Sequence, residues 1–141
     1  MPYILVIAND SSCRRLYVDN LVMRGYVTVG TASTNEAHVL LHTHMPELII
    51  VCAIRAGQED SVVELRNMNS LDNIPIVLVA PELPDREWMK TWNVAGSLPY
   101  PMDLRKLLMN LRPWLRSQPL TTTTETFGSI SRPLGLGNLA A

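Results

Sequence analysis

Five short apolar runs alternate with amphipathic segments along this chain, and this alternation constrains the fold more than any other feature. The runs are too short for helices and are bounded by polar residues, glycine or proline, which is typical of buried strands. Strands that alternate with helices through short connections predict a parallel sheet covered by helices on both faces. The predicted strands are 3–8, 26–31, 48–52, 76–80 and 95–99.

Five helices are expected between and after these strands, because apolar residues recur there at helical spacing. Ser33 or Thr34 can cap the second helix, while Gly25 ends the first helix and Pro46 ends the second. The buried positions predicted for the five helices are, in order, Cys13, Leu16, Tyr17 and Leu21; Ala37, Leu40 and Leu41; Val62, Val63, Leu65 and Met68; Trp88, Met89 and Trp92; and Leu104, Leu107, Leu108 and Leu111.

The size and composition of the chain are those of one globular domain, with 141 residues, 47% hydrophobic and 18% charged. The formal net charge of −1 argues against a nucleic-acid-binding domain, which would carry an excess of Lys and Arg. No apolar run approaches the roughly 20 residues of a membrane span, and no basic leader precedes the first run. With only two cysteines, a reducing, cytoplasmic location is expected.

The composition changes after Pro119, where a threonine run and scattered glycines replace the apolar periodicity. We therefore expect a domain over 1–118 and a polar tail or linker over 119–141. Such a segment can be a terminus or the start of a connection to an output domain, and both alternatives stay open.

Four stretches of the sequence, taken in order, resemble the receiver domain of bacterial response regulators. They are I-L-V-I-A-N-D at 4–10, P-E-L-I-I-V-C at 46–52 followed by A-G at 56–57, I-P-I-V-L-V-A at 74–80, and G-S-L-P-Y-P-M at 96–102. The match covers about residues 3–116, and its specificity comes from the four motifs standing in register. The resemblance implies a flavodoxin-like α/β fold, a doubly wound five-stranded parallel sheet of order 2-1-3-4-5 flanked by five helices.

The same resemblance implies where phosphoryl chemistry would sit. Working receivers accept a phosphoryl group on an aspartate after the third strand, hold Mg²⁺ with an acidic pair after the first, and bind the phosphoryl oxygens with a Ser or Thr and a Lys. In this chain the matching positions depart from that pattern throughout, and only Asp10, one place beyond the acidic pair, is acidic. The resemblance therefore implies a pseudo-receiver whose degenerate, aspartate-less phosphoacceptor pocket consists of Ala8, Asn9, Asp10, Cys52, Ala80 and Tyr100.

The role of Cys52 has alternatives. We expect a small apolar side chain that fills space at a strand end. A redox switch is the alternative, and it would need a thiol of lowered pKa. Cys13, near the start of the first helix, can approach the same pocket, although a Cys13–Cys52 disulfide requires close Cα atoms. A third hypothesis retains a phosphoacceptor on another carboxylate, such as Glu59 or Asp60.

Two aromatic features point to a plugged pocket and to a contact surface. The resemblance implies a cis Tyr100–Pro101 bond, and the Tyr100 ring is expected to plug the vacated pocket. Trp88 and Trp92 are four residues apart, so they share a helix face that is either a core stripe or a binding anchor. In receivers the surface of the fourth helix, fifth strand and fifth helix meets partners or a second copy, so the candidate interaction face is Trp88, Trp92, Met102 and Arg105.

His38 and His42 are spaced to chelate a metal, but a solvated helix face is the better interpretation, as it is for Arg14 and Arg15. We predict no enzyme activity and no cofactor or metal. The predicted function is two-component-type signal transduction, independent of phosphorylation, through a protein partner or a homodimer. No contact of this domain with nucleic acid or a membrane is expected.

Overall fold

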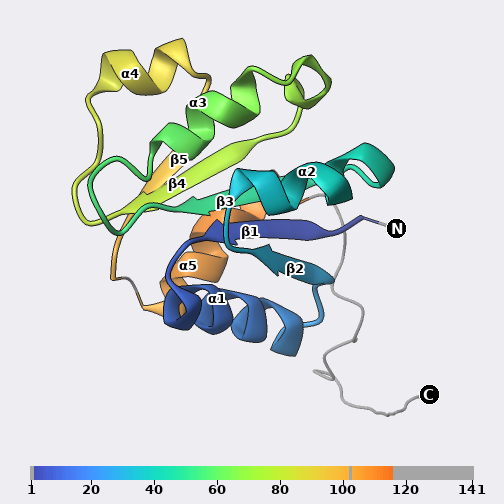
Figure 1. The fold of residues 1–141 in the computed structure, drawn as a ribbon. Helices are drawn as coiled ribbons and strands as arrows, with labels where there is room; N and C mark the ends of the chain where they lie inside the picture. Colours follow the sequence, from blue (N-terminus) through green and yellow to red (C-terminus); the bar gives the residue numbers. More distant parts are fainter. Residues whose placement is uncertain (1, 102, 116–141) are drawn as a thin grey trace.

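A computed structural model describes residues 2–101 and 103–115, and it contains a five-stranded, all-parallel sheet (Figure 1). The strand order is β2-β1-β3-β4-β5, which confirms the predicted fold class. The sequence runs that predicted strands differ from the observed ones by two residues at most. The strands are β1 (Ile4–Ala8), β2 (Thr28–Thr31), β3 (Leu48–Cys52), β4 (Ile76–Ala80) and β5 (Gly96–Pro99).

Helices cover both faces of the sheet, as Figure 1 shows, with α1 and α5 on one face and α2, α3 and α4 on the other. None of the helices in the described part of the chain is long and apolar enough to cross a membrane. The predicted tail at 119–141 and Met102 lie outside the described residues. The helices are α1 (Ser11–Met23), α2 (Thr34–Thr43), α3 (Asp60–Arg66), α4 (Arg86–Thr91) and α5 (Leu104–Leu111), with short 3₁₀ helices η1 (Asn69–Leu71) and η2 (Arg112–Trp114).

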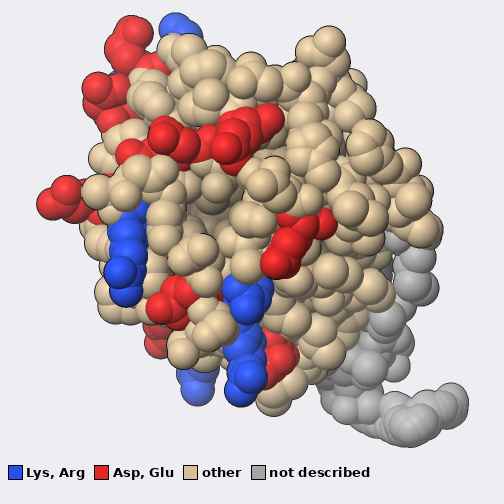
Figure 2. Space-filling model, in the orientation of Figure 1, with Lys and Arg blue, Asp and Glu red and all other residues tan. Residues whose placement is uncertain are grey.

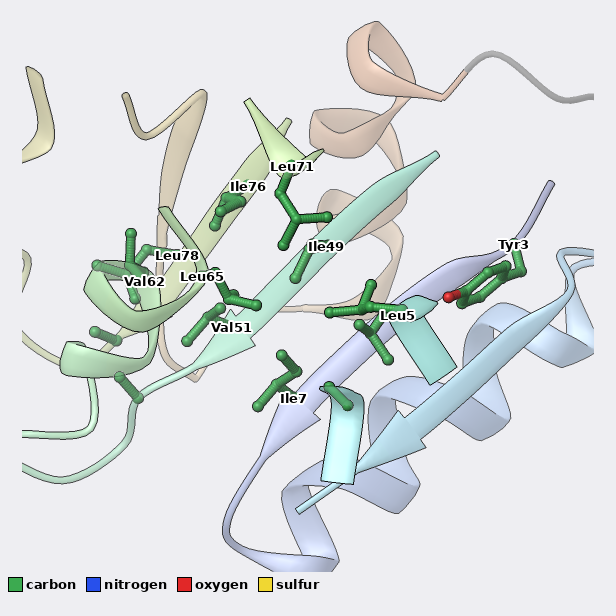
Figure 3. Packing of buried hydrophobic residues seen from close by; sticks show 14 residues of the cluster. Tyr3, Leu5, Ile7, Ile49, Val51, Val62, Leu65, Leu71, Ile76 and Leu78 are labelled. Atoms are coloured by element: carbon green, nitrogen blue, oxygen red, sulfur yellow. The ribbon is translucent and has the colours of Figure 1, made fainter. Parts of the chain in front are cut away.

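The core consists of two apolar layers, one on each face of the sheet. Every residue of β1, β3 and β4 is buried, because these central strands are covered on both sides. Alternate residues of each strand point into opposite layers. Figure 3 shows the layer beneath α2 and α3, where Leu5, Ile49 and Leu65 pack together. The layer beneath α1 and α5 contains Ile50, Tyr17 and Leu107.

Helices α1, α2, α4 and α5 each begin directly after a polar residue whose side chain caps the helix. Each capping side chain accepts a hydrogen bond from a free backbone N–H in the first helical turn, an interaction that stabilises a helix by about 1 kcal/mol. The N-caps are Asp10 for α1, Ser33 for α2, Asp85 for α4 and Asp103 for α5.

Several helix positions differ from their predicted burial. Leu16 was predicted to be buried and is 44% exposed, because α1 turns only Cys13, Tyr17 and Leu21 fully towards the sheet. Leu40, Val63, Leu108, Met68, Trp88, Met89 and Trp92 are only partly buried. Trp92 also lies just past the end of α4, as its C-cap, so Trp88 and Trp92 do not belong to one continuous helix.

Arg66, at the end of α3, ties together the amino ends of β4 and β5. Its guanidinium donates hydrogen bonds to the carbonyl oxygens of Leu71 at 2.6 Å, Ile74 at 3.0 Å, Trp92 at 3.1 Å and Asn93 at 2.9 Å. Burial lowers the pKa of Arg66, the Asp72 carboxylate opposes that shift, and the planar fork of donors suits several acceptors at once. One side chain therefore fixes two connections that are far apart in sequence.

The ring of Trp114, in η2, occupies the space beside Gly96 at the start of β5. A Cβ atom placed on Gly96 would lie 2.4 Å from the nearest ring carbon of Trp114, closer than any ordinary contact. Glycine is therefore required here by a close approach, and the C-terminal turn packs directly on the sheet.

Candidate functional site

The carboxyl ends of four strands meet at one edge of the sheet, where parallel α/β proteins place their sites. Ala8 ends β1 and lies opposite Cys52, which ends β3. Ala80 ends β4, and its carbonyl accepts a hydrogen bond of 3.0 Å from the backbone N–H of Tyr100. The structure thus brings together Ala8, Cys52, Ala80 and Tyr100, four of the residues singled out from the sequence.

The buried strand ends at this edge are apolar and uncharged: Ala8 and Cys52 belong to the layer beneath α1 and α5, and Ala80 belongs to the layer beneath α2 and α3. Ala8, Cys52 and Ala80 are each buried and contribute two methyl groups and one thiol. Buried positions like these hold charged groups only when partners compensate the loss of water. No carboxylate, ammonium or hydroxyl group of these three residues is available for phosphoryl chemistry.

Asp10, the acidic residue that follows β1, caps helix α1. Its Oδ1 accepts a hydrogen bond of 2.8 Å from the backbone N–H of Cys13, the geometry of an N-cap. Asn9 is exposed beside it and shares a cavity with Cys52. The capping role explains why Asp10 is acidic without any need for a metal.

Arg14 is closer to this edge than the sequence suggested. We predicted a solvated helix face, yet its Nη1 donates a 2.7 Å hydrogen bond to the carbonyl of Ala8, and its stem packs over Gly30 of β2. Arg14 lies one turn after the N-cap of α1, so its guanidinium reaches back to the end of β1. Arg15, by contrast, is exposed as predicted.

Cys13 and Cys52 are both free and buried, and both side chains belong to the layer beneath α1 and α5. Interaction with the Cys52 thiol lowers the pKa of Cys13, against the opposing effects of burial and of the Asp10 charge. Interaction with the Cys13 thiol, together with deep burial, raises the pKa of Cys52.

Two tyrosines adjoin the thiols. Burial raises the pKa of Tyr17 and of Tyr100, and a negative charge on either thiol would raise both further. Tyr100 is partly buried against the layer beneath α1 and α5, and the Tyr100–Pro101 peptide bond is cis. The phenols are therefore neutral, apolar-bodied neighbours of the thiol pair.

A cavity of about 370 Å³ opens beside Cys52. Its lining is polar and includes Asn9, the α2 residue Thr34 and the α3 residue Glu64, whose carboxylate accepts a hydrogen bond from the Thr34 hydroxyl. Cys52 borders this cavity, while its side chain belongs to the layer beneath α1 and α5.

A second cavity, of about 340 Å³, is lined by Ala80 and by the glutamates Glu59 and Glu82. The Glu59 carboxylate accepts a hydrogen bond of 2.9 Å from the backbone N–H of Gly57, so it stabilises the loop before α3. Asp60 is exposed at the start of α3 and does not line this cavity. Of the two carboxylates considered as substitute acceptors, only Glu59 borders the carboxyl edge.

The histidine pair of α2 lies on a solvated surface. His38 and His42 are exposed, and their ring centroids are 6.0 Å apart. Among residues 2–101 and 103–115, no group of three or more His, Cys, Asp or Glu side chains is arranged to hold a metal ion.

The candidate interaction face is only partly described. Trp88 and Trp92 pack against the layer beneath α2 and α3 with part of each ring exposed, Arg105 is exposed on α5, and Met102 lies outside the described residues. On the side of the molecule seen in Figure 2, Lys and Arg side chains are separated by acidic ones and form no continuous basic surface.

Comparison with solved structures identifies the fold. The chain aligns with the chemotaxis protein CheY4 of Vibrio cholerae at a TM-score of 0.72 and 21% identity, covering 82% of this chain and 99% of CheY4. It aligns with a response regulator receiver protein of Pseudomonas putida at a TM-score of 0.66 and 25% identity, covering 79% and 96%. The chain has the fold of a response-regulator receiver domain.

Comparison of sequences alone gives a weaker match. This chain is 20% identical over 122 residues to the regulatory protein VirG of Agrobacterium tumefaciens (strain 15955). The match takes in 84% of this chain and 45% of VirG, so the chain spans less than half the length of that relative. No family model matches this chain.

Proposed function

We propose that this receiver domain acts in two-component-type signal transduction as a pseudo-receiver, which signals through protein contacts and takes no phosphoryl group at Cys52. The observation that carries the proposal is the chemistry of the carboxyl edge. Buried Ala8, Cys52 and Ala80 stand at the strand ends, and the carboxylate of Asp10 caps α1.

The physical argument is one of charge. Phosphoryl transfer to a carboxylate needs an ionised acceptor, a divalent cation and donors that neutralise the phosphoryl oxygens. Mg²⁺ prefers oxygen ligands, and the buried side chains at this edge offer a sulfur and methyl groups. The raised pKa of Cys52 also keeps its thiol protonated, which makes it a poor nucleophile.

The proposal is tested by incubating the full chain with acetyl phosphate and Mg²⁺, and separately with beryllofluoride, followed by intact mass and tryptophan fluorescence. The expected result is an unchanged mass and unchanged emission. The RstA receiver domain of Klebsiella pneumoniae, described as BeF3-activated, is a suitable positive control.

A stable gain of one phosphoryl group would contradict the pseudo-receiver proposal. In that case Glu59→Gln and Asp60→Asn identify the acceptor, since each removes one candidate carboxylate with little change in shape. Loss of the mass gain in Glu59→Gln alone would place the chemistry in the cavity beside Ala80.

The proposed contact surface is formed by α4, β5 and α5, either with a protein partner or with a second copy. Its support is the partly exposed ring of Trp88, the neighbouring Leu83, which is 42% exposed, and the exposed Arg105. Tryptophan and arginine are enriched among residues that dominate binding energy. Sedimentation velocity over a concentration series tests the homodimer form.

The matched pair of variants for that experiment is Trp88→Ala and Met23→Ala. Met23 is 80% exposed at the end of α1, away from the proposed surface. We expect self-association to weaken in Trp88→Ala and to persist in Met23→Ala. Equal behaviour of the two variants would contradict a homodimer through this surface, leaving a protein partner as its proposed occupant.

A further inference from the structure

Two of the three histidines of the chain lie side by side on α2. His38 and His42 are four residues apart, so their side chains project from the same face of the helix. Both are exposed, their ring centroids are 6.0 Å apart, and the ring planes are tilted by 42°. Their exposure was expected from the sequence, whereas the separation of the rings comes from the structure.

The separation of the rings is compatible with one shared metal ion. A bond from zinc to a histidine nitrogen is about 2.1 Å long, so the centroid of a bound ring lies roughly 3.2 Å from the ion. Two rings on one ion therefore have centroids at most about 6.4 Å apart. The observed separation is within this limit. A tetrahedral arrangement brings the centroids roughly 1 Å closer, which exposed side chains reach by small rotations about their χ angles.

The ring nitrogens of the pair are not engaged by other protein groups. Within the described part of the chain, the rings of His38 and His42 contact each other and make no hydrogen bond or ion pair. The third histidine differs, because the Nδ1 atom of His44 lies 3.1 Å from the Oγ1 atom of Thr43. Helix α2 contains no Lys or Arg, so it places no fixed positive charge that would oppose a bound cation.

The fold fixes the backbone that carries the pair. Ala37 and Leu41, which directly precede the two histidines, are buried against the sheet and anchor the opposite side of α2. The Ser33 side chain caps the first turn of the helix by accepting from the Glu36 N–H. Binding of an ion therefore orders two side chains and requires no movement of the helix.

We propose that His38 and His42 form a surface site that binds one divalent transition-metal ion per chain, such as Ni²⁺ or Zn²⁺. Imidazole nitrogen suits these ions, whereas Mg²⁺ prefers oxygen ligands. Among residues 2–101 and 103–115, no group of three His, Cys, Asp or Glu is arranged to hold a metal. Water therefore fills the remaining coordination positions, and the ion binds reversibly, unlike the zinc of a closed structural site.

The proposed metal site lies outside the pocket at the carboxyl edge. Helix α2 begins at that edge, where Thr34 lines the cavity beside Cys52. At about 1.5 Å per residue, His38 and His42 lie roughly 6 and 12 Å along the helix axis from Thr34. The proposal goes beyond the proposed function and does not depend on it, because neither histidine belongs to the pocket or to the α4, β5 and α5 surface.

The test is a titration of the full chain, without an affinity tag, by isothermal calorimetry with Ni²⁺, with Zn²⁺ and with Mg²⁺. We expect one Ni²⁺ or Zn²⁺ ion per chain and no binding of Mg²⁺ at the same concentrations. Thermal unfolding provides a second measurement. With Ni²⁺ at ten times its dissociation constant, the melting temperature should rise by roughly 3 °C, because the folded helix presents both imidazoles together.

The third histidine provides a matched control. His38→Ala and His42→Ala should each weaken Ni²⁺ binding by roughly tenfold, because the second imidazole binds at a high effective concentration. His44→Ala should leave the affinity unchanged. All three side chains are exposed, so these variants are expected to fold. Proton NMR of the wild type in Zn²⁺ requires no variant, and the ring signals of His38 and His42 should shift while those of His44 stay in place.

Three outcomes would overturn the proposal. The first is equal Ni²⁺ affinity in the wild type and His38→Ala, since each imidazole would then act alone. The second is binding that persists when His38 and His42 are both replaced by alanine, which would place the ion elsewhere. The third is one ion for every two chains, which would require ligands from a second copy.

Discussion

The two ends of the sheet differ in charge. At the amino ends of β4 and β5, the charged Arg66 donates hydrogen bonds to four backbone carbonyls. The carboxyl ends of β1, β3 and β4 are the buried residues Ala8, Cys52 and Ala80. The first edge keeps a charge and satisfies it with protein partners. At the second edge the buried strand-end residues carry no charge, and the guanidinium of Arg14, which reaches this edge, donates to the Ala8 carbonyl. A partly buried charge surrounded by acceptors stabilises a fold, and a charge without partners would cost free energy. The buried strand ends at the carboxyl edge therefore contribute to apolar packing.

The largest expected effect comes from placing a charge at the apolar edge. Cys52→Asp would bury a carboxylate between Ala8 and Cys13, and we expect it to lower the free energy of unfolding by about 4 kcal/mol at pH 7. Burial would raise the pKa of the new carboxyl above its unfolded value of about 3.9, so the loss should shrink as the pH falls towards that value. Urea unfolding at pH 7 and pH 4.5 measures this difference.

The control for that variant is Cys52→Asn, which has nearly the same shape and no charge. Its cost should be smaller and should not change between the two pH values. Equal losses for Cys52→Asp and Cys52→Asn would show that this edge tolerates a charge, which would contradict the comparison.

The next effect is expected at the opposite edge. Arg66→Ala removes the donors for the carbonyls of Leu71, Ile74, Trp92 and Asn93, and should lower the free energy of unfolding by about 3 kcal/mol, since water can replace part of the interaction. Arg66→Lys keeps the charge without the planar fork, so it should recover less than half of the loss. Chemical unfolding followed by circular dichroism provides the measurement, and full recovery by lysine would show that charge alone matters.

A third variant tests steric fit at the amino end of β5. Gly96→Ala would place a methyl group 2.4 Å from the Trp114 ring, and we expect a loss of about 2 kcal/mol as the ring is displaced. Tryptophan emission should shift to the red as the ring meets water. In a Trp114→Leu background the same substitution should cost much less, and an unchanged cost would place the strain elsewhere.

The smallest effect is expected for Asp10. Asp10→Ala removes the side chain that accepts from the Cys13 N–H, and the loss of an N-cap costs about 1 kcal/mol. Asp10→Asn keeps the cap and should be nearly neutral. If Asp10→Asn instead abolished a thermal stabilisation by Mg²⁺, Asp10 would have a role in metal binding that the capping geometry does not explain.

The strands could be predicted from the sequence because their signal is local, whereas their order was implied by the resemblance to receiver domains. Apolar runs such as 48–52 and 76–80 lie between polar boundaries, and alternation with helices leaves few arrangements for a parallel sheet. Burial on the helices was less predictable. Leu16 fits the helical spacing of Cys13 and Tyr17, yet it lies beyond the edge of the strip that α1 buries.

The contacts of the two edges were not predictable, because they join residues far apart in the chain. The carbonyl acceptors of Arg66 extend to Asn93, and the sequence does not indicate which backbone oxygens accept a hydrogen bond from a distant side chain. Arg14 looked like an exposed charge because sequence does not show that its guanidinium reaches the Ala8 carbonyl. The candidate site positions came from a resemblance, and only the structure shows that Cys13 and Cys52 belong to one buried layer.

The contact between Gly96 and Trp114 has a mechanical consequence. Strand β5 has four residues, so it is roughly 13 Å long at about 3.3 Å per residue, with the Trp114 ring against its first residue and Tyr100 directly after its last. Because Gly96 has no Cβ atom, the Trp114 ring packs directly against the backbone of the strand. The ring therefore blocks β5 from the side at its first residue, so a shift of Gly96 out of the sheet towards η2 would displace Trp114.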